Sequence, residues 1–173
     1  MVTLGGISNQ LEADSLTAKY NSMLSTNIHS NGENQAGPYP EYFYPNYGNS
    51  LEPFQCTWWA WGRASMYLSQ YGTKYKKYPT TYGNGGDYYT NGQQYFNCGK
   101  SPKPNSIISM TSTGPYAQYG HVAYVEGVTN EGIYISHANA GVGWRGVTFM
   151  SNEEWQRRTS PSDKGFVYLN EPK

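Results

Sequence analysis

The stretch Gln-Cys-Thr-Trp-Trp-Ala-Trp-Gly-Arg-Ala, residues 55–64, decides the fold of this chain. The residues from Thr57 to about Tyr71 include Ala, Met, Leu and Trp and contain no proline, which favours a helix. Cys56 then lies at the helix N-terminus, with Gln55 or Thr57 as a candidate cap. The positive end of a helix dipole favours the thiolate form of a cysteine. Cys56 is therefore a candidate nucleophile, although a free cysteine is also often a small buried apolar residue.

A second stretch, Tyr-Gly-His-Val-Ala-Tyr-Val-Glu-Gly-Val at residues 119–128, predicts a strand that begins at His121. A cysteine with a histidine elsewhere in the chain is the arrangement used in thiol catalysis, where the imidazole takes the thiol proton. The two stretches together favour a catalytic role for Cys56 and His121.

These motifs resemble the CHAP domain, the cysteine, histidine-dependent amidohydrolase/peptidase, which is related to the papain-like and NlpC/P60 peptidoglycan hydrolases. The resemblance extends from about Tyr39 to Leu169. It includes Pro-Asn-Ser-Ile-Ile-Ser-Met at residues 104–110, where Asn and Ser replace the usual small pair, and Gly-Phe-Val-Tyr-Leu at residues 165–169. It implies a papain-like CHAP fold.

The residue pattern itself predicts an α+β domain with helices packed on a small antiparallel β-sheet. Strands are expected at 107–111, 121–128, 133–138, 146–150 and 165–169, with a hairpin turn at 129–132. The 173-residue length suits one domain. We expect the CHAP catalytic domain to cover residues 38–173 and the polar residues 1–37 to form an N-terminal arm or linker.

Composition excludes several classes of function. The formal net charge is zero, and no Lys/Arg cluster is larger than Lys-Tyr-Lys-Lys at residues 74–77, so nucleic acid is not expected as a partner. No apolar run has the length of a membrane span. Residues 1–10 lack the pattern of a signal peptide. We therefore expect a domain of a larger polypeptide, or a protein exported by lysis or as part of an assembly.

A catalytic imidazole needs a third residue that fixes its orientation. On the strand expected at 133–138, alternation places His137 and Asn139 on one face, where both are candidates to orient His121. CHAP domains usually have Glu-x-Asn here, so His137 replaces the glutamate and Asn139 matches the asparagine. The related NlpC/P60 enzymes are similar in using a second histidine. Glu126 is a weaker candidate because it lies an odd number of residues from His121.

The remaining site residues are candidates for binding. The backbone N–H of Cys56 is a natural oxyanion donor, and the resemblance implies Gln55 as a second donor, with an ordinary helix cap as the alternative. Trp59 and Tyr47 are candidate substrate-binding aromatics, with core packing as the alternative. No cofactor is expected, and no zinc site, because close Cys/His pairs are lacking. The resemblance implies that some members bind calcium through an acidic loop just before the cysteine, but residues 49–53 carry only one carboxylate, so no such metal site is expected. A disulfide between Cys56 and Cys98 is not expected, since it would block the nucleophile.

The resemblance implies a hydrolase of bacterial peptidoglycan that cuts the N-acetylmuramoyl-L-alanine amide or a bond in the stem or cross-bridge peptide. It implies action outside the cell, in the cell wall or on a virion, as in phage lysins, tail-associated lysins, or wall hydrolases of conjugation and secretion systems. The alternative is a catalytically inactive module that binds the cell wall. The reactivity of the Cys56 thiol distinguishes the two, because only a catalytic thiol should react much faster than Cys98.

Overall fold

The computed structural model describes residues 15, 41–43, 45–139 and 145–173. The arm or linker predicted at 1–37 therefore lies, except for residue 15, outside the described residues. Within the described part, helices pack on a six-stranded antiparallel sheet, which confirms the predicted α+β class. No helix in these ranges is both long and apolar enough to cross a membrane.

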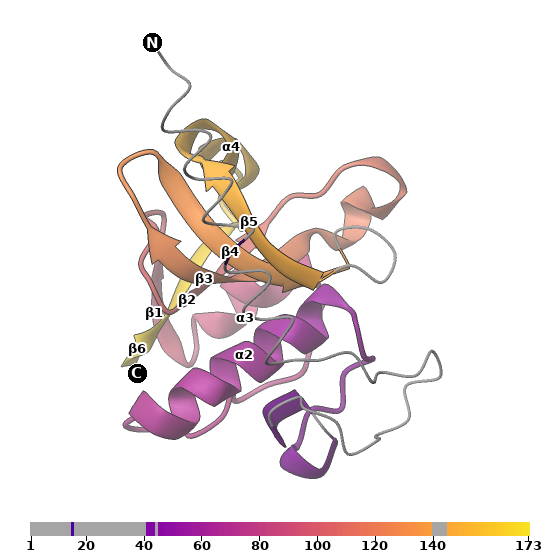
Figure 1. Cartoon of the computed structure of the whole chain (residues 1–173), viewed down its shortest axis with the longest axis vertical. Coiled ribbons are helices and arrows are strands. Elements are labelled where there is room, and N and C mark those ends of the chain that lie inside the picture. Colours follow the sequence, from indigo (N-terminus) through magenta and orange to yellow (C-terminus); the bar gives the residue numbers. More distant parts are fainter. Residues whose placement is uncertain (1–14, 16–40, 44, 140–144) are drawn as a thin grey trace.

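The helix predicted after Cys56 is α2 (Cys56–Tyr71), and it lies across one face of the sheet (Figure 1). It ends at Gly72, whose backbone N–H donates to the carbonyl oxygen of Leu68. Gly62 is buried under the ring of Phe43, and a Cβ at this position would lie only 2.4 Å from that ring. The helix is thus held between the sheet and the aromatic segment that precedes it, which fixes the position of its N-terminus.

The strand order in the sheet is β1-β6-β2-β3-β4-β5, and every neighbouring pair is antiparallel. The strands are β1 (Phe96–Gly99), β2 (Ser106–Met110), β3 (His121–Val128), β4 (Gly132–Ala138), β5 (Arg145–Ser151) and β6 (Gly165–Pro172). The predicted strand from 121 to 128 is found with these bounds, and the other four predicted strands are found with ends shifted by a few residues.

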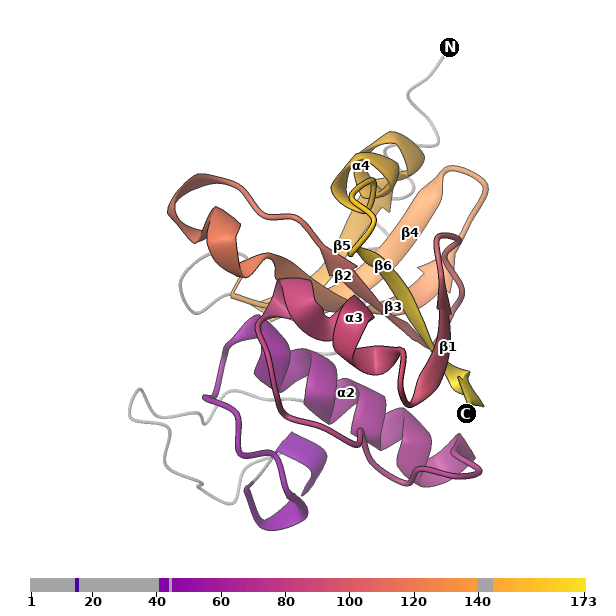
Figure 2. The same cartoon turned by 180° about the vertical axis from the view of Figure 1, so that it is seen from behind.

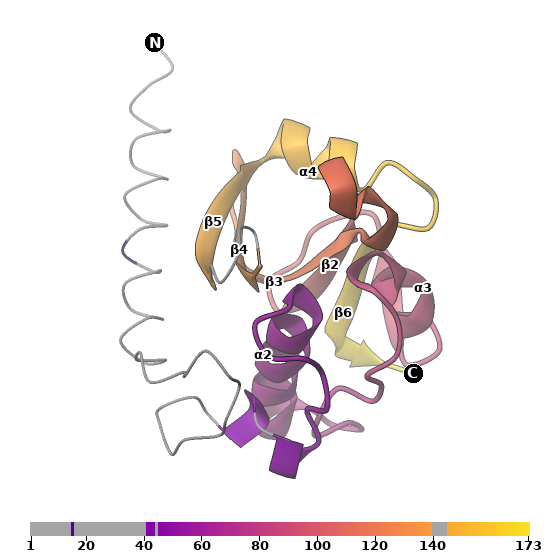
Figure 3. The ribbon, with the colours of Figure 1, turned by 90° about the vertical axis from the view of Figure 1, so that its right-hand side faces the viewer.

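Shorter helices complete the fold. They are the 3-10 helices η1 (Glu41–Phe43), η2 (Pro45–Tyr47), η3 (Gly85–Asp87) and η4 (Gly114–Tyr119), and the α-helices α3 (Tyr88–Gly92) and α4 (Asn152–Arg158). Figure 2 shows α3 beside α2 on the same side of the sheet. Figure 3 shows the sheet curved between α2 on one side and α4 on the other.

Alternation along β3 divides the apolar core between the two faces of the sheet. Val122 and Tyr124 belong to the cluster that contains the buried side chains of α2, whereas Ala123 and Val125 belong to the cluster that Trp155 of α4 covers. By the same alternation His121 projects on the α4 side. His121 is the first residue of β3, opposite Met110 of β2, and therefore lies at an end of the sheet.

Candidate functional site

Cys56 is the first residue of α2, as the sequence predicted. Its thiol is half-buried and contacts three backbone amides, those of Val122, Thr57 and Cys56 itself. Burial has the largest effect and raises the pKa of the thiol, while the three amides oppose that rise. The helix start alone therefore does not produce a thiolate. A nearby base must accept the proton before the sulfur becomes a nucleophile.

The amide of Val122 places the Cys56 thiol against the start of β3, where His121 is the preceding residue. Gly85 of η3 packs against the same backbone, and a Cβ on Gly85 would lie 2.8 Å from the His121 carbonyl carbon. The hydroxyl of Ser109 donates to the Gly85 carbonyl oxygen over 2.8 Å and fixes this loop. Cys56 and His121, far apart in sequence, thus have adjoining backbone positions.

His121 and His137 are joined by a hydrogen bond of 2.8 Å between His121 Nε2 and His137 Nδ1. The other ring nitrogen of His137, Nε2, lies 2.9 Å from the hydroxyl oxygen of Thr148 on β5. His137 is only 6% exposed, whereas its two partners are partly exposed. If His121 Nε2–H donates to His137 Nδ1, then His137 Nε2–H donates to Thr148, and His121 Nδ1 carries the lone pair.

Both imidazoles are neutral near pH 7. Burial lowers the pKa of His121 to about 4, with a smaller contribution from the positive charge of Arg158. Burial also lowers the pKa of His137 to about 3, with smaller contributions from His121 and Arg158. The Arg158 guanidinium is held at 2.8 and 3.0 Å by the carbonyl oxygen of Thr111, directly after β2. A neutral His121 can act as a proton acceptor.

We expect the free energy of unfolding to decrease as the pH is lowered from 6.5 to about 4, because of the pair His121 and His137. In that window the unfolded histidines bind protons and the folded ones do not, so acid favours the unfolded state. Urea unfolding at several pH values measures the effect. His137→Gln removes one of the two buried imidazoles and should show a smaller loss of stability over the same window. Equal losses in both proteins would contradict the assignment of neutral buried imidazoles.

The side chain of Asn139 forms its hydrogen bond with Gln55 and not with His121. Asn139 follows the last residue of β4 with a φ of 60°, so it no longer obeys the alternation of the strand. Its Nδ2 donates over 2.8 Å to Oε1 of Gln55. The structure thus brings His137, and not Asn139, into hydrogen-bond contact with His121.

Gln55 is the N-cap residue of α2, but its side chain makes no capping hydrogen bond. The expectation that the Gln55 side chain caps the helix is therefore wrong. Because Asn139 occupies its Oε1, the Gln55 amide is oriented with Nε2 as the group that is left to donate.

For Trp59, the structure favours the alternative of core packing over substrate binding. Trp59 is 1% exposed, packs on Phe43, and donates from Nε1 to Ser136 Oγ over 3.0 Å. These contacts give Trp59 a packing role in this structure. Tyr47 is half-buried, its ring packs edge-on against Tyr42, and its hydroxyl donates to the carbonyl oxygen of Lys76. These contacts give Tyr47 a packing role.

Glu126 does not orient His121 in this structure. Its carboxylate pairs with Arg63 at 3.0 and 3.1 Å and accepts a hydrogen bond of 2.6 Å from Ser136. The structure also identifies two residues near the histidine pair that sequence reasoning missed, Thr148 and Arg158. Thr148 lies in a predicted strand, but no pattern in the sequence indicates which strand that segment would pair with.

Both cysteines, Cys56 and Cys98, are free thiols. Among the described residues, no group of three or more His, Cys, Asp or Glu side chains is arranged to hold a metal ion. The groups available for chemistry at this end of the sheet are thus a thiol, two neutral imidazoles, a hydroxyl and an oriented amide.

The CHAP domain family matches residues 46–139, which is more than half of the chain. A solved structure described as "The crystal structure of Ly7917 with the hydrolyzing product of MDP" is similar over 69% of this chain, with 15% identity and a TM-score of 0.46. The chain covers 56% of that protein. No curated protein matches the chain. The family match confirms the resemblance seen in the sequence. The chain belongs to the CHAP domain family.

Proposed function

We propose that the chain hydrolyses amide bonds of peptidoglycan with Cys56 as nucleophile and His121 as general base and acid. The observation that carries this proposal is the hydrogen-bonded series from His121 through His137 to Thr148, at the same end of β3 where the Cys56 thiol contacts the backbone. A series of this kind holds one imidazole in a single tautomer, which is what general-base catalysis requires.

In the proposed reaction, His121 Nδ1 takes the proton from the Cys56 thiol, and the sulfur attacks the amide carbonyl carbon. The tetrahedral intermediate then collapses as the C–N bond breaks, and the imidazolium gives its proton to the leaving amine. Water next attacks the thioester with His121 as base. The acid product leaves, and the proton returns to the sulfur.

The negative oxygen of the intermediate needs hydrogen-bond donors at fixed positions. The backbone N–H of Cys56 and the Nε2 group of Gln55 are the proposed donors. The hydrogen bond from Asn139 to Gln55 Oε1 supports the second of these, because it holds the amide with its nitrogen available. Asn139 then acts on the oxyanion site through Gln55 and not on the imidazole.

His137 is the proposed orienting residue for His121. As a neutral acceptor at Nδ1, it keeps the proton of His121 on Nε2 and leaves Nδ1 for the thiol. A neutral imidazole stabilises the imidazolium less than the glutamate that CHAP domains usually have here. Thr148 in turn keeps the proton of His137 on its own Nε2.

We expect Thr148→Val to lower kcat about tenfold with little change in KM, because loss of this partly buried hydrogen bond costs on the order of 1.4 kcal/mol and leaves the proton of His137 no longer fixed on Nε2. Steady-state kinetics on a soluble peptidoglycan fragment measures the change. Thr148→Ser keeps the hydroxyl and should restore most of the lost kcat. Equal kcat in wild type and Thr148→Val would show that the hydroxyl has no part in positioning.

The bond that is cut is proposed to be the N-acetylmuramoyl-L-alanine amide or a peptide bond of the stem or cross-bridge. The setting is proposed to be the cell wall or a virion, as in phage lysins, tail-associated lysins, or wall hydrolases of conjugation and secretion systems. The proposals for the bond and for the setting both rest on the family and on the resemblance described above.

Digestion of purified Gram-positive cell walls, with mass spectrometry of the released fragments, tests the function. Wild type should release fragments whose new termini identify the bond, and a new amino group on L-alanine would separate the amidase from an endopeptidase. If wild type sediments with the walls and releases nothing, the chain is a binding module and the catalytic proposal is wrong.

A further inference from the structure

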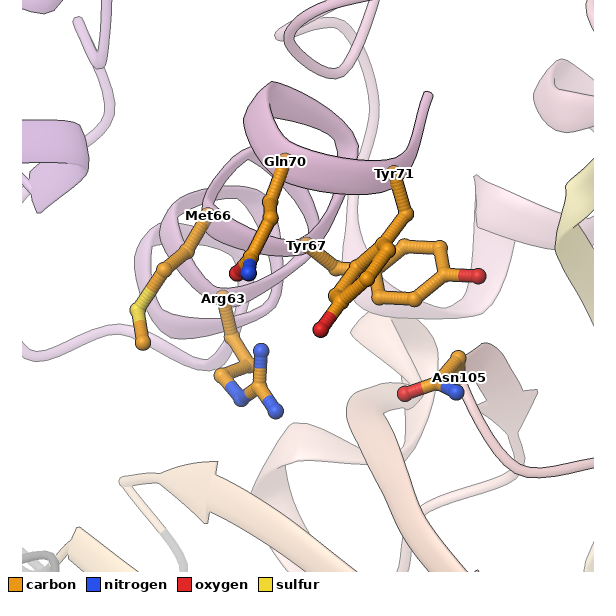
Figure 4. A pocket seen from close by; sticks show the side chains of 6 residues that line it. All are labelled: Arg63, Met66, Tyr67, Gln70, Tyr71 and Asn105. Carbon is orange, nitrogen blue, oxygen red and sulfur yellow. The ribbon is translucent and has the colours of Figure 1, made fainter. Parts of the chain in front are cut away.

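A pocket lies beside the C-terminal half of α2, away from the helix N-terminus that carries Cys56 (Figure 4). Its volume is about 480 Å³, and it is lined by Arg63, Met66, Tyr67, Gln70, Tyr71 and Asn105. We propose that this pocket binds the glycan strand of peptidoglycan, as a subsite separate from the bond that is cut. The choice of ligand rests on the proposed function above.

The pocket has an aromatic wall of the kind that stacks against the apolar faces of sugar rings. Tyr67 and Tyr71 are one helical turn apart on α2, with ring centroids 5.2 Å apart and planes tilted by 36°. Tyr71 is 61% exposed, so its ring is among the large apolar groups that the fold leaves in water. A ligand that covers this ring removes its apolar surface from water, which favours binding.

The polar groups of the pocket suit a neutral ligand with hydroxyl and acetamido groups. Gln70 and Asn105 bring side-chain amides from opposite sides of the space (Figure 4). Asn105 is fixed, because its Oδ1 accepts a 2.7 Å hydrogen bond from Tyr124, which leaves its amide nitrogen as the group to donate. The charge of Arg63 is balanced by its two hydrogen bonds to Glu126. Because the charge of Arg63 is already neutralised by Glu126, a neutral sugar suits the pocket better than a charged peptide does.

The position of the pocket favours a polymer. Tyr67 and Tyr71 follow Cys56 by eleven and fifteen residues on the same helix, which corresponds to about 16–22 Å along its axis. A single sugar bound at the thiol does not span this distance, and an extended peptide would need about five to seven residues to do so. A glycan strand with attached peptides can occupy the pocket while one of its peptides reaches Cys56, and binding to the strand would then raise the local concentration of amide bonds at the thiol.

The proposal is tested by binding alone, in the Cys56→Ala protein, so that hydrolysis does not enter the measurement. The probe is the β-1,4-linked tetramer of N-acetylglucosamine, which carries no peptide, titrated while NMR signals of the protein are followed. We expect the largest shifts at the pocket residues and a Kd at least about fivefold weaker after Tyr71→Ala in the same background. Tyr71→Phe keeps the ring and should keep most of the affinity.

Tyr82→Ala is the matched control, because Tyr82 is 79% exposed and does not line the pocket. It should bind the tetramer as the parent protein does. Absence of shifts at the pocket at saturating tetramer, or an unchanged Kd in Tyr71→Ala, would overturn the proposal. These outcomes are independent of cell-wall digestion by the wild type. A failure of the glycan subsite is therefore distinguishable from a failure of the proposed hydrolase function.

Discussion

Replacing Cys56 with alanine is expected to lower the rate of peptidoglycan hydrolysis by at least about a thousandfold while leaving the fold intact. The effect is large because the proposed reaction forms a bond to the sulfur, and no other thiol lies at the start of β3 among the described residues. The half-buried thiol fits a site that alanine can occupy without strain. Release of dye-labelled fragments from cell walls measures the rate, and circular dichroism checks the fold.

Cys98→Ala is the control for this experiment. Cys98 lies on β1, is also half-buried, and contacts the carbonyl oxygen of its own strand residue Phe96. Its removal tests for general effects of losing a partly buried thiol and should leave activity near that of wild type. A folded Cys56→Ala protein that still hydrolyses walls at the wild-type rate would exclude covalent catalysis by this residue.

Replacing His137 with alanine is expected to lower kcat by about a hundredfold to ten-thousandfold, the range seen when the residue that orients a catalytic imidazole is changed. The cause is loss of the 2.8 Å hydrogen bond that fixes the tautomer of His121. His29→Ala changes the third histidine of the chain and should have no effect on kcat. Wild-type kcat in His137→Ala would mean that His121 needs no partner from β4.

His137→Glu tests the same contact through pH. Glutamate is the residue that CHAP domains usually have here, and its carboxylate can accept the Nε2–H of His121. Its negative charge should raise the pKa of His121 above the value of about 4 in the wild type, so the acid limb of kcat/KM should move to higher pH. A variant with activity but an unmoved acid limb would contradict contact between the two side chains.

The elements that carry the site follow from the sequence because their signals are local. The proline-free run from Thr57 predicts α2, and the alternation from His121 predicts β3 with the bounds that are found. The antiparallel hairpin of β3 and β4 follows from the turn at 129–132 in the same way. Alternation along β4 also places His137 on the face of His121, where the hydrogen bond is found.

The contacts of Asn139 and Trp59 depend on information that is not local in the sequence. Asn139 leaves the strand alternation through a positive φ, which the sequence does not encode in a recognisable pattern. Trp59 is buried because Phe43 and Ser136, from distant parts of the chain, close over it. A tryptophan three residues from the nucleophile can face substrate or core, and only the packing of α2 between two layers decides between them.

The elements that were not predicted are short. β1 has four residues, and it forms because β6 offers an edge to pair with. α4 has seven residues, with Ser151 as its cap and acidic side chains in its first turn, but a helix of this length is stable only when Trp155 packs on the sheet. Thr148 was missed for a related reason, because its contact with His137 depends on the pairing of β5 with β4.

Site-resolved alkylation by iodoacetamide tests the central claim most directly, that His121 activates the thiol of Cys56. Burial raises the pKa of Cys98 to about 11, so this residue is an internal reference for an unactivated thiol. The account predicts that Cys56 reacts much faster than Cys98 near pH 7 in the wild type, and that His121→Ala lowers the rate at Cys56 to about that of Cys98. Equal, slow rates at the two thiols in the wild type, or a fast Cys56 that is unchanged in His121→Ala, would contradict it.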